Sequence, residues 1–329
     1  MRKFRLFGAN FKTVISGHNP TSLAGYLSTA SRIAREDESD FTALFADFDD
    51  RSSTEIQALP RGVKRVLVRN EPKVVRPQNH KPALLREIDF IVDVGRPPSS
   101  ESIQVNWPQT WDLSLLESPQ ARDLIRSNRV ALINANKLSF VPGELYSLRR
   151  QLVTQSGQID TWGPGWSINP LRKFVTALKE LVIAIRHGAG ISATSLNGWF
   201  KRPQNYLGLS ASKLQTLSSY NYSLVIENSM EFMTEKLFDS LFAGTYPIYV
   251  GPKLELFGIP GFVASQASAD IDSVIRALES ASEVDLASWR RMTLEWLRSE
   301  GVEEGWSSSH VLEQIINTID KELDSGRRT

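Results

Sequence analysis

Four polar side chains that could bind an anion or a hydroxyl group lie close together in the C-terminal half of the sequence. Glu227 and Asn228 directly follow the apolar run 223–226, and Glu235 and Lys236 follow after a short loop. A short apolar run that ends in polar residues is typical of a buried parallel strand. A lysine in the first turn of a helix is unfavourable unless a negative ligand offsets it. The spacing therefore predicts an anion-binding loop between a strand and a helix.

The residues around this loop predict the elements that hold it. Thr234 is expected to cap a helix that has an apolar face at helical spacing and ends at Gly244. Residues 246–250 form the expected next strand. In open α/β sheets, ligands bind beyond the carboxyl ends of the strands, and the free N–H groups of a helix start favour an anion. We therefore expect the ligand at the carboxyl edge of a parallel sheet.

The order of these residues resembles the donor-site signature of the α-1,3-fucosyltransferase family. Members of that family are inverting, metal-independent enzymes that use GDP-fucose. The resemblance implies an α/β fold with two Rossmann-like domains facing each other across a cleft, as in GT-B glycosyltransferases. It covers about thirty residues closely, and these are Glu227-Asn228-Ser229, Thr234-Glu235-Lys236, Gly244-Thr245, Pro247 and Gly251.

The resemblance also implies roles for individual donor-site residues. Lys236 matches the lysine that binds the diphosphate, and Glu235 matches a glutamate that accepts hydrogen bonds from ribose or sugar hydroxyls. Asn228 resembles a donor-contacting asparagine. Phe232 occupies a position where relatives carry tyrosine, so a possible hydroxyl contact is missing. Glu227 either contacts the donor or accepts hydrogen bonds from N–H groups of the loop.

Inverting glycosyl transfer needs a base that accepts the proton of the acceptor hydroxyl. Glu71 follows the expected strand 63–68 and precedes Pro72. The family carries a first-domain carboxylate in a comparable position at a strand end, so the resemblance implies that Glu71 is the base. The alternative is a solvated glutamate without a catalytic role.

The arginine with which the family holds the diphosphate has no counterpart before the expected helix 143–153. Lys137 lies in the preceding loop and is the expected substitute. Arg149 and Arg150 are further candidates, but they lie within the helix, where an arginine is usually solvated. At most one of these two could face the site, because neighbouring residues of a helix point in different directions.

The length of 329 residues suggests two domains. Strand-like and helix-like segments alternate, which indicates parallel sheets. We expect a first domain at 1–127 for the acceptor. A second domain at 128–329 is expected to bind the nucleotide sugar and to include the closing C-terminal helices.

The composition narrows the possible partners. The net charge of +1 shows no bias toward nucleic acid, and the absence of cysteine excludes disulfides and thiol catalysis. No cofactor is expected beyond a nucleotide-sugar co-substrate, and the acceptor is expected to be a glycan or glycolipid. No apolar run is long enough to span a membrane, so we expect a cytoplasmic enzyme, with peripheral contact to the inner membrane surface as an option.

Other motifs of the sequence allow different interpretations. Asp47-Phe48-Asp49-Asp50 resembles a metal-binding pair but is interpreted as a loop, and we expect no metal site. The helix expected from Pro170 has cations on its polar face and is interpreted as extra packing. The alternatives are that it covers the acceptor cleft or contacts a lipid surface. Rival functions are transfer of another nucleotide-activated sugar and a non-catalytic sugar-binding relative. A nicotinamide oxidoreductase is disfavoured, because no glycine fingerprint follows a strand of the first half.

Overall fold

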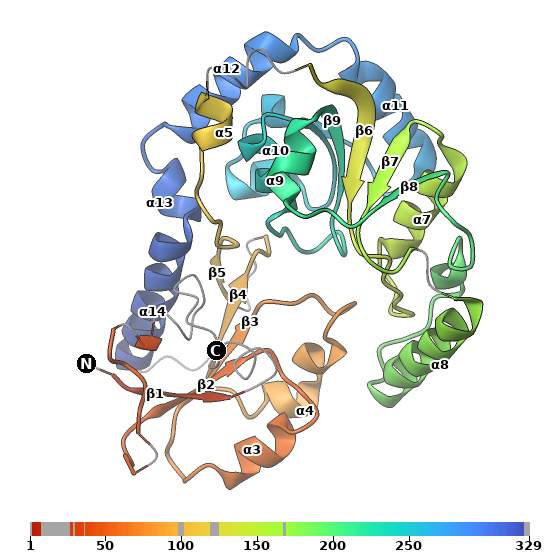
Figure 1. The fold of residues 1–329 in the computed structure, drawn as a ribbon. Helices are drawn as coiled ribbons and strands as arrows, with labels where there is room; N and C mark the ends of the chain where they lie inside the picture. Colours follow the sequence, from red (N-terminus) through yellow and green to blue (C-terminus); the bar gives the residue numbers. More distant parts are fainter. Residues whose placement is uncertain are drawn as a thin grey trace. The chain divides into compact units, whose positions relative to one another are not determined.

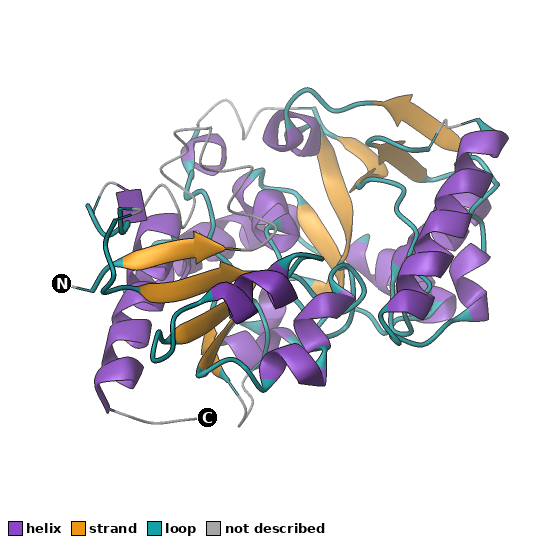
Figure 2. Cartoon of the chain, turned by 90° about the horizontal axis from the view of Figure 1, so that it is seen from below, coloured by secondary structure: helices purple, strands orange, loops and turns teal. Residues whose placement is uncertain are grey.

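The computed structural model describes residues 2–7, 27–28, 30–35, 37–97, 102–118, 125–166 and 169–325. The chain forms two compact units, Met1–Trp111 with Glu303–Thr329, and Asp112–Val302. Each unit is built on its own parallel sheet with helices packed beside it (Figures 1 and 2). The two-domain α/β fold class predicted from the sequence is confirmed.

The first unit contains a sheet in the order β1-β2-β3-β4-β5. Alternate residues of these strands face opposite sides. Leu44, Val66 and Val92 pack against α14 on one face, and Phe45 and Leu67 pack against the α3 side on the other. The elements are β1 Phe4–Phe7, β2 Thr42–Ala46, α3 Ser52–Ala58, β3 Arg65–Arg69, the 3₁₀ helix η1 Pro77–His80, α4 Pro82–Leu85, β4 Phe90–Val94, β5 Ile103–Val105, α13 Val302–Trp306 and α14 Ser308–Ser325.

The boundaries of the two units differ from the expected ones. Residues 112–127 belong to the second unit, and the chain from Glu303 onward belongs to the first. The reason is the apolar face of α14, where Val311, Ile315 and Ile319 are fully or almost fully buried against the first sheet (Figure 1). The spacing of these residues shows that the helix has a buried face, but it does not say which sheet covers that face.

The second unit contains a sheet in the order β11-β10-β9-β6-β7-β8. From β6 the chain first builds outward through β7 and β8, and then returns to the other side of β6 with β9. The strand order therefore reverses between β6 and β9. Its elements are α5 Ser114–Glu117, β6 Ser127–Ile133, α7 Tyr146–Gln155, β7 Ile159–Trp162, α8 Pro170–Arg186, η2 Ala193–Leu196, β8 Asn205–Gly208, α9 Lys213–Ser218, β9 Tyr220–Ile226, α10 Lys236–Phe242, β10 Tyr246–Val250, η3 Leu254–Phe257, η4 Gly261–Val263, β11 Ser265–Gln266, α11 Ile271–Ala281 and α12 Leu286–Leu297.

The expected elements around the signature are present. β9 and β10 pair in parallel in the register Ile248 to Leu224. Gly244, with a φ of 64°, follows the end of α10 in the left-handed conformation that glycine adopts at low cost.

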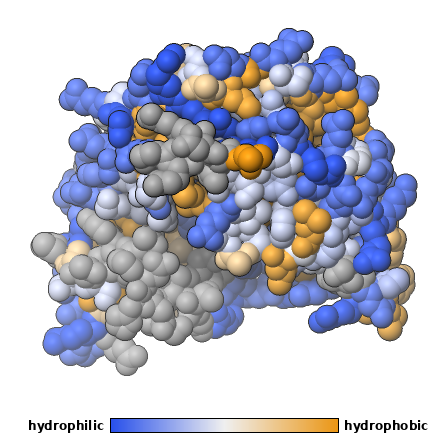
Figure 3. Space-filling view, turned by 45° about the horizontal axis from the view of Figure 1, so that its top comes forward, coloured by the Kyte–Doolittle hydropathy of each residue, from blue (hydrophilic) through white to orange (hydrophobic). Residues whose placement is uncertain are grey.

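Hydrophilic residues predominate on the face of the molecule seen in Figure 3, where apolar residues form separate patches. In the described part of the chain, no helix is both long and apolar enough to cross a membrane.

Candidate functional site

The reversal of strand order between β6 and β9 defines the position at which open α/β sheets bind ligands. Two loops leave the sheet there, one after each strand. They are joined by an antiparallel bridge between Glu144 and Ser229 and by a hydrogen bond of 3.1 Å from the Leu145 N–H to the Asn228 carbonyl. The signature loop is therefore held directly at this edge, as expected.

Glu227 organises the signature loop from inside the protein. Its side chain is fully buried, and both of its carboxylate oxygens accept hydrogen bonds. Oε1 accepts from the Thr234 N–H at 2.9 Å, and Oε2 accepts from the Thr234 hydroxyl and from Lys236 Nζ, each at 2.7 Å. These contacts match the expected alternative in which Glu227 is an acceptor for loop N–H groups.

Thr234 does not cap the following helix, contrary to the expectation. The N-cap position belongs to Glu235, whose side chain makes no capping hydrogen bond, and α10 begins at Lys236. The Thr234 hydroxyl instead donates to Glu227 and accepts from Lys236 Nζ at 2.5 Å. Burial explains the difference, because a fully buried carboxylate requires several donors and Thr234 supplies two of them.

Gly251 allows β10 to pass close to Glu227. A Cβ atom at this position would lie 2.8 Å from Glu227 Cγ and 2.4 Å from the Tyr249 hydroxyl. Neither neighbour can withdraw easily, because both side chains are fully buried. The glycine of the signature thus has a packing role at the carboxyl end of β10.

Lys236 and Glu235 are the signature side chains that reach the surface. The Lys236 side chain is 15% exposed and the Glu235 side chain is 37% exposed. Glu235 and Asp239 both pair with Lys213, at 3.0 and 3.2 Å. Burial opposes the ionisation of Glu235, but the adjacent Lys236 and Lys213 outweigh it and lower the pKa of Glu235 to about 2. Glu235 is therefore an ionised acceptor at neutral pH.

Asn228 is held by Arg149, which lies beneath the carboxyl end of β9. Arg149 donates to the carbonyls of Ile226 and Glu227 at 2.5 and 2.6 Å and to Asn228 Oδ1 at 3.1 Å. It is only 2% exposed, and Arg150 is fully buried beside it. The expectation that these arginines are solvated is wrong. The surrounding Leu148, Leu152 and Val153 were a sequence signal for burial.

Lys137 is placed as expected, in the loop after β6. It is exposed, and its ammonium group makes no hydrogen bond or ion pair with the described residues. Its carbonyl accepts from Arg150 at 2.5 Å, which fixes the backbone of the loop. Gly163 lies next to this loop, where a Cβ atom would meet the Asn134 carbonyl oxygen at 2.4 Å. Lys137 is thus a cation on a well-supported loop, without a partner among the described residues.

Phe232 lies in the interior beneath the signature loop. It is fully buried, as is the adjacent Met233. In this conformation its ring offers no surface to a ligand, although its position in the signature predicted a donor contact. The loss of the tyrosine hydroxyl is consistent with this burial, because a phenyl ring needs no hydrogen-bond partner in the core.

Glu71 belongs to the first unit and lies just beyond the carboxyl end of β3, half-buried. Its backbone N–H donates to Asp47 Oδ1 at 3.1 Å, and the Asn70 N–H donates to the same oxygen at 2.8 Å. Asn79 Nδ2 is the third donor to this oxygen, at 2.6 Å. Asp47 therefore fixes the backbone that carries Glu71, a role that was not expected from the sequence.

The aspartates of the Asp47–Asp50 segment have structural partners. Asp47 is fully buried, and Asp49 accepts from the side chain of Arg51 at 2.8 Å and from the Ser52 hydroxyl at 3.3 Å. Over the described ranges, no three side chains of histidine, aspartate or glutamate gather in a way that could hold a metal ion.

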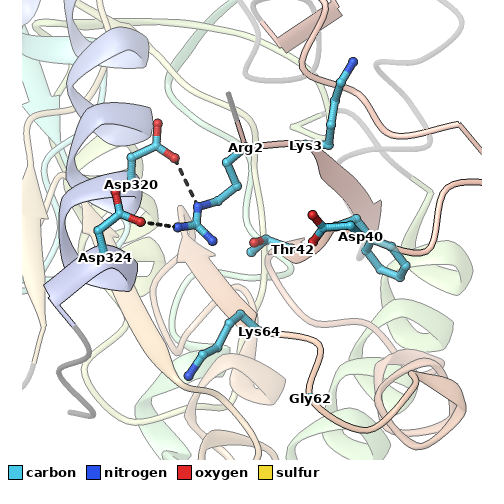
Figure 4. Close-up of a pocket in the computed structure, with 9 residues that line it drawn as sticks. Arg2, Lys3, Asp40, Thr42, Gly62, Lys64, Asp320 and Asp324 are labelled. Atoms are coloured by element: carbon cyan, nitrogen blue, oxygen red, sulfur yellow. Dashed lines mark hydrogen bonds and ion pairs between the residues drawn. The ribbon is translucent and has the colours of Figure 1, made fainter.

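A cavity of about 520 Å³ opens at the opposite, amino edge of the first sheet (Figure 4). Arg2 and Lys3 precede β1, Thr42 begins β2 and Lys64 precedes β3. Arg2 is turned toward Asp320 and Asp324, with ion-pair distances of 3.3 and 2.6 Å. Parallel sheets bind ligands at the carboxyl edge, so this cavity is not the candidate site.

Comparisons with known proteins agree with the architecture. No family model and no curated protein matches the sequence. The structure is similar to that of an α-1,3-fucosyltransferase, with a TM-score of 0.56 and 12% identity, over 98% of this chain and 90% of that chain. An α-1,3-fucosyltransferase structure with GDP-fucose gives a TM-score of 0.51 and 13% identity, over 97% of this chain and 89% of that chain.

A second solved structure is similar to a comparable extent. Anabaena HepE in complex with UDP and glucose gives a TM-score of 0.54 and 10% identity, over 96% of this chain and 91% of that chain. Identities this low show a shared fold. The chain therefore has the α/β fold of GT-B glycosyltransferases, built from two units that each contain a parallel sheet.

Proposed function

We propose that this protein is a glycosyltransferase that binds a nucleotide-activated sugar at the carboxyl edge of the second sheet. One observation carries the proposal. The reversal of strand order between β6 and β9 coincides with the loop that bears Glu227, Asn228, Glu235 and Lys236. Fold topology and sequence signature are independent reasons to place a ligand, and both indicate the same loop.

The polar groups of this edge suit a nucleotide diphosphate. We assign Lys236 and Lys137 to the diphosphate, because each is a cation with N–H donors that the described residues do not engage. Glu235 is ionised and is assigned to sugar or ribose hydroxyls. Asn228 is assigned to the donor through its amide nitrogen, because its Oδ1 already accepts from Arg149. Glu227 positions Lys236 from below.

For the finer specificity we propose GDP-fucose, with inversion at the anomeric carbon and a glycan or glycolipid acceptor. The support is the signature itself together with the similarity to α-1,3-fucosyltransferase structures. A UDP-linked sugar is the second candidate. It is favoured by the comparable similarity to Anabaena HepE, which is solved with UDP and glucose.

In the proposed reaction, Glu71 accepts the proton of an acceptor hydroxyl as the oxygen attacks the anomeric carbon. The bond from that carbon to the phosphate oxygen breaks, and the nucleoside diphosphate leaves with the bonding electrons. Lys236 and Lys137 stabilise the negative charge that develops on the diphosphate, an effect often larger than that of the base. The Asp47 hydrogen bonds fix the backbone that carries Glu71.

Isothermal titration with GDP, UDP, CMP and dTDP tests the proposal. We expect tightest binding of GDP, and release of GDP from GDP-fucose when an oligosaccharide acceptor is present. Lys236→Met should weaken GDP binding roughly 10–100-fold, the loss typical of a hydrogen bond between charged groups. Arg276→Met, which removes an exposed cation of α11, is the matched control and should leave binding unchanged.

Three outcomes would count against this proposal. Binding of none of the four nucleotides would overturn it. Selective UDP binding would replace the donor but keep the reaction class. Binding of a nucleotide sugar without hydrolysis or transfer across the acceptor panel would instead indicate a non-catalytic relative. Unfolding curves of each variant show whether a loss of binding is merely a loss of folding.

A further inference from the structure

The long helix α8 carries an apolar face that is turned toward solvent. Leu171, Val175, Val182 and Ile185 are 70, 58, 61 and 61% exposed. Phe174 and Leu178 lie on the same side and are about half exposed. At 100° per residue, these six side chains occupy one arc of roughly 100° on the helix. Large exposed apolar faces of this kind mark an interaction surface.

The opposite side of α8 fixes the helix to the second unit, so the exposed face does not result from a poorly attached helix. Lys173 Nζ donates to the Trp199 carbonyl at 2.7 Å, and Trp199 Nε1 donates to the Lys173 carbonyl at 3.1 Å. Ala184 is buried in the same cluster as Trp199. The N-terminus is capped by Asn169, whose Oδ1 accepts from the Leu171 N–H at 2.8 Å. The helix is therefore locked with its apolar face outward.

Three exposed cations border the apolar face along one edge. Arg172, Lys179 and Arg186 are spaced by seven residues, which places them in one row next to Val175 and Val182. Glu180 is the sole acidic residue among residues 169–204, which contain six lysines and arginines. The protein thus contains a strongly basic segment, although its net charge is only +1.

This combination of an apolar face and a cationic border fits an anionic lipid surface. A helix of this type lies in the plane of a membrane interface, with its apolar side chains among the acyl chains and its cations among the head groups. Each lysine or arginine near an anionic leaflet adds to the attraction. A second copy of the chain fits less well, because antiparallel pairing of two α8 helices would bring the cationic rows together.

We propose that α8 docks this protein peripherally on an anionic bilayer. Phe174, Leu178 and the other exposed apolar residues enter the interface, and the row Arg172, Lys179 and Arg186 contacts acidic head groups. The helix of 17 residues is about 25 Å long and lies parallel to the surface. The surface is on the second unit and does not depend on what the signature loop binds.

Sedimentation of the full chain with lipid vesicles, without nucleotide, tests this surface. We expect binding to vesicles of equal parts phosphatidylglycerol and phosphatidylcholine, and little binding to phosphatidylcholine alone. The triple variant Arg172→Gln, Lys179→Gln, Arg186→Gln should reduce the partition on the order of 100-fold. The matched control replaces the exposed Lys253, Arg276 and Arg291 by Gln and should reduce it much less.

The double variant Leu178→Ser, Val182→Ser tests the apolar contribution and should also release the protein from vesicles. Leu256→Ser, Ile275→Ser is its control on other exposed apolar positions. Equal partition of the α8 variants and their controls would overturn the proposal, as would failure of the wild-type protein to bind anionic vesicles. If the wild-type protein instead forms a dimer that Leu178→Ser, Val182→Ser dissociates, the face is a contact between copies.

Discussion

The two sheets of this protein have different strand orders. Their carboxyl edges therefore differ in whether they offer a crevice to a ligand. In the first sheet the described strands follow one another in sequence from β1 to β5. In the second sheet the order reverses at β6, so the loops after β6 and β9 diverge from neighbouring strands. A reversal leaves a crevice at the sheet edge where a ligand can enter. Among the described strands, only the second sheet has this feature.

Both edges contain a buried acid that fixes a strand-end loop, but the acids have different partners. Asp47 of the first unit receives backbone and amide N–H groups from Asn70, Glu71 and Asn79. Burial raises the pKa of Asp47, and the hydrogen bonds only partly offset this. Glu227 of the second unit instead pairs with the cation of Lys236 at 2.7 Å.

The consequence concerns what each loop can offer to a ligand. The donors that reach Asp47 are mainly backbone groups and a buried amide, so they are consumed in holding the loop. Lys236 is partly exposed and has three N–H donors, of which Glu227 and Thr234 each engage one. The second loop can therefore be rigid and still present a positive charge.

The largest expected effect is the loss of turnover in Glu71→Gln. If Glu71 is the base at the first edge, this change should lower the turnover number by about 10²–10⁴. Nucleotide affinity measured by titration should be unchanged, because the nucleotide is assigned to the second edge. Glu87→Gln, which alters an exposed glutamate of the same unit, serves as the control. A Glu71→Gln enzyme with a near-normal rate would remove Glu71 from the mechanism.

The two buried acids should respond unequally to amidation. In Glu227→Gln, either orientation of the amide turns an NH₂ group toward a donor, because both oxygens of Glu227 are acceptors. We expect the free energy of unfolding to fall by about 3 kcal/mol. In Asp47→Asn, the amide oxygen can take the place of Oδ1 and still accept its hydrogen bonds. This change should lower the free energy of unfolding by about 1 kcal/mol. Urea unfolding of both variants checks this order, and equal losses would show that the partners of the two acids are equivalent.

His80 gives the first edge a distinct dependence on pH. Burial, together with the neighbouring Arg69 and Arg96, lowers the pKa of His80 to about 3. The unfolded chain takes up this proton below its ordinary pKa of about 6.5, so His80 should reduce stability progressively as the pH falls from there toward 3. Over that range, the free energy of unfolding of His80→Gln should therefore fall by about 1–2 kcal/mol less than that of the wild type. Identical pH profiles would show that His80 stays solvated.

Glu235 should produce a smaller effect at the second edge and at lower pH. Its pKa of about 2 lies below that of an unfolded glutamate, so its stabilising contribution is complete above pH 4.5 and disappears as the pH falls through 2. Because the side chain is partly exposed, Glu235→Gln should cost about 0.5 kcal/mol at pH 7 and nothing near pH 2. Thermal unfolding at both pH values measures the difference. A cost that persists at low pH would indicate lost packing instead of lost charge.

The signature segment shows which structural features the local sequence predicts. The apolar run, the helical spacing and Gly244 predicted a strand, a helix and a second strand, and all three are present. Prediction was poorer for side chains whose partners are distant in sequence. Arg149 was expected to be solvated, but its acceptors at Ile226 and Glu227 are more than seventy residues away. No local pattern contains that contact.

The chain order of polar and apolar residues fixed the α/β class, the signature loop and the amphipathic nature of α8 and α14, because these depend on short-range spacing. The folded arrangement decided which faces are covered. In the folded protein, α14 packs against the first sheet and the apolar face of α8 is exposed to solvent. Glu227 is buried and accepts hydrogen bonds from Thr234 and Lys236. Burial depends on which segments meet in space, and residues far apart in the chain determine that.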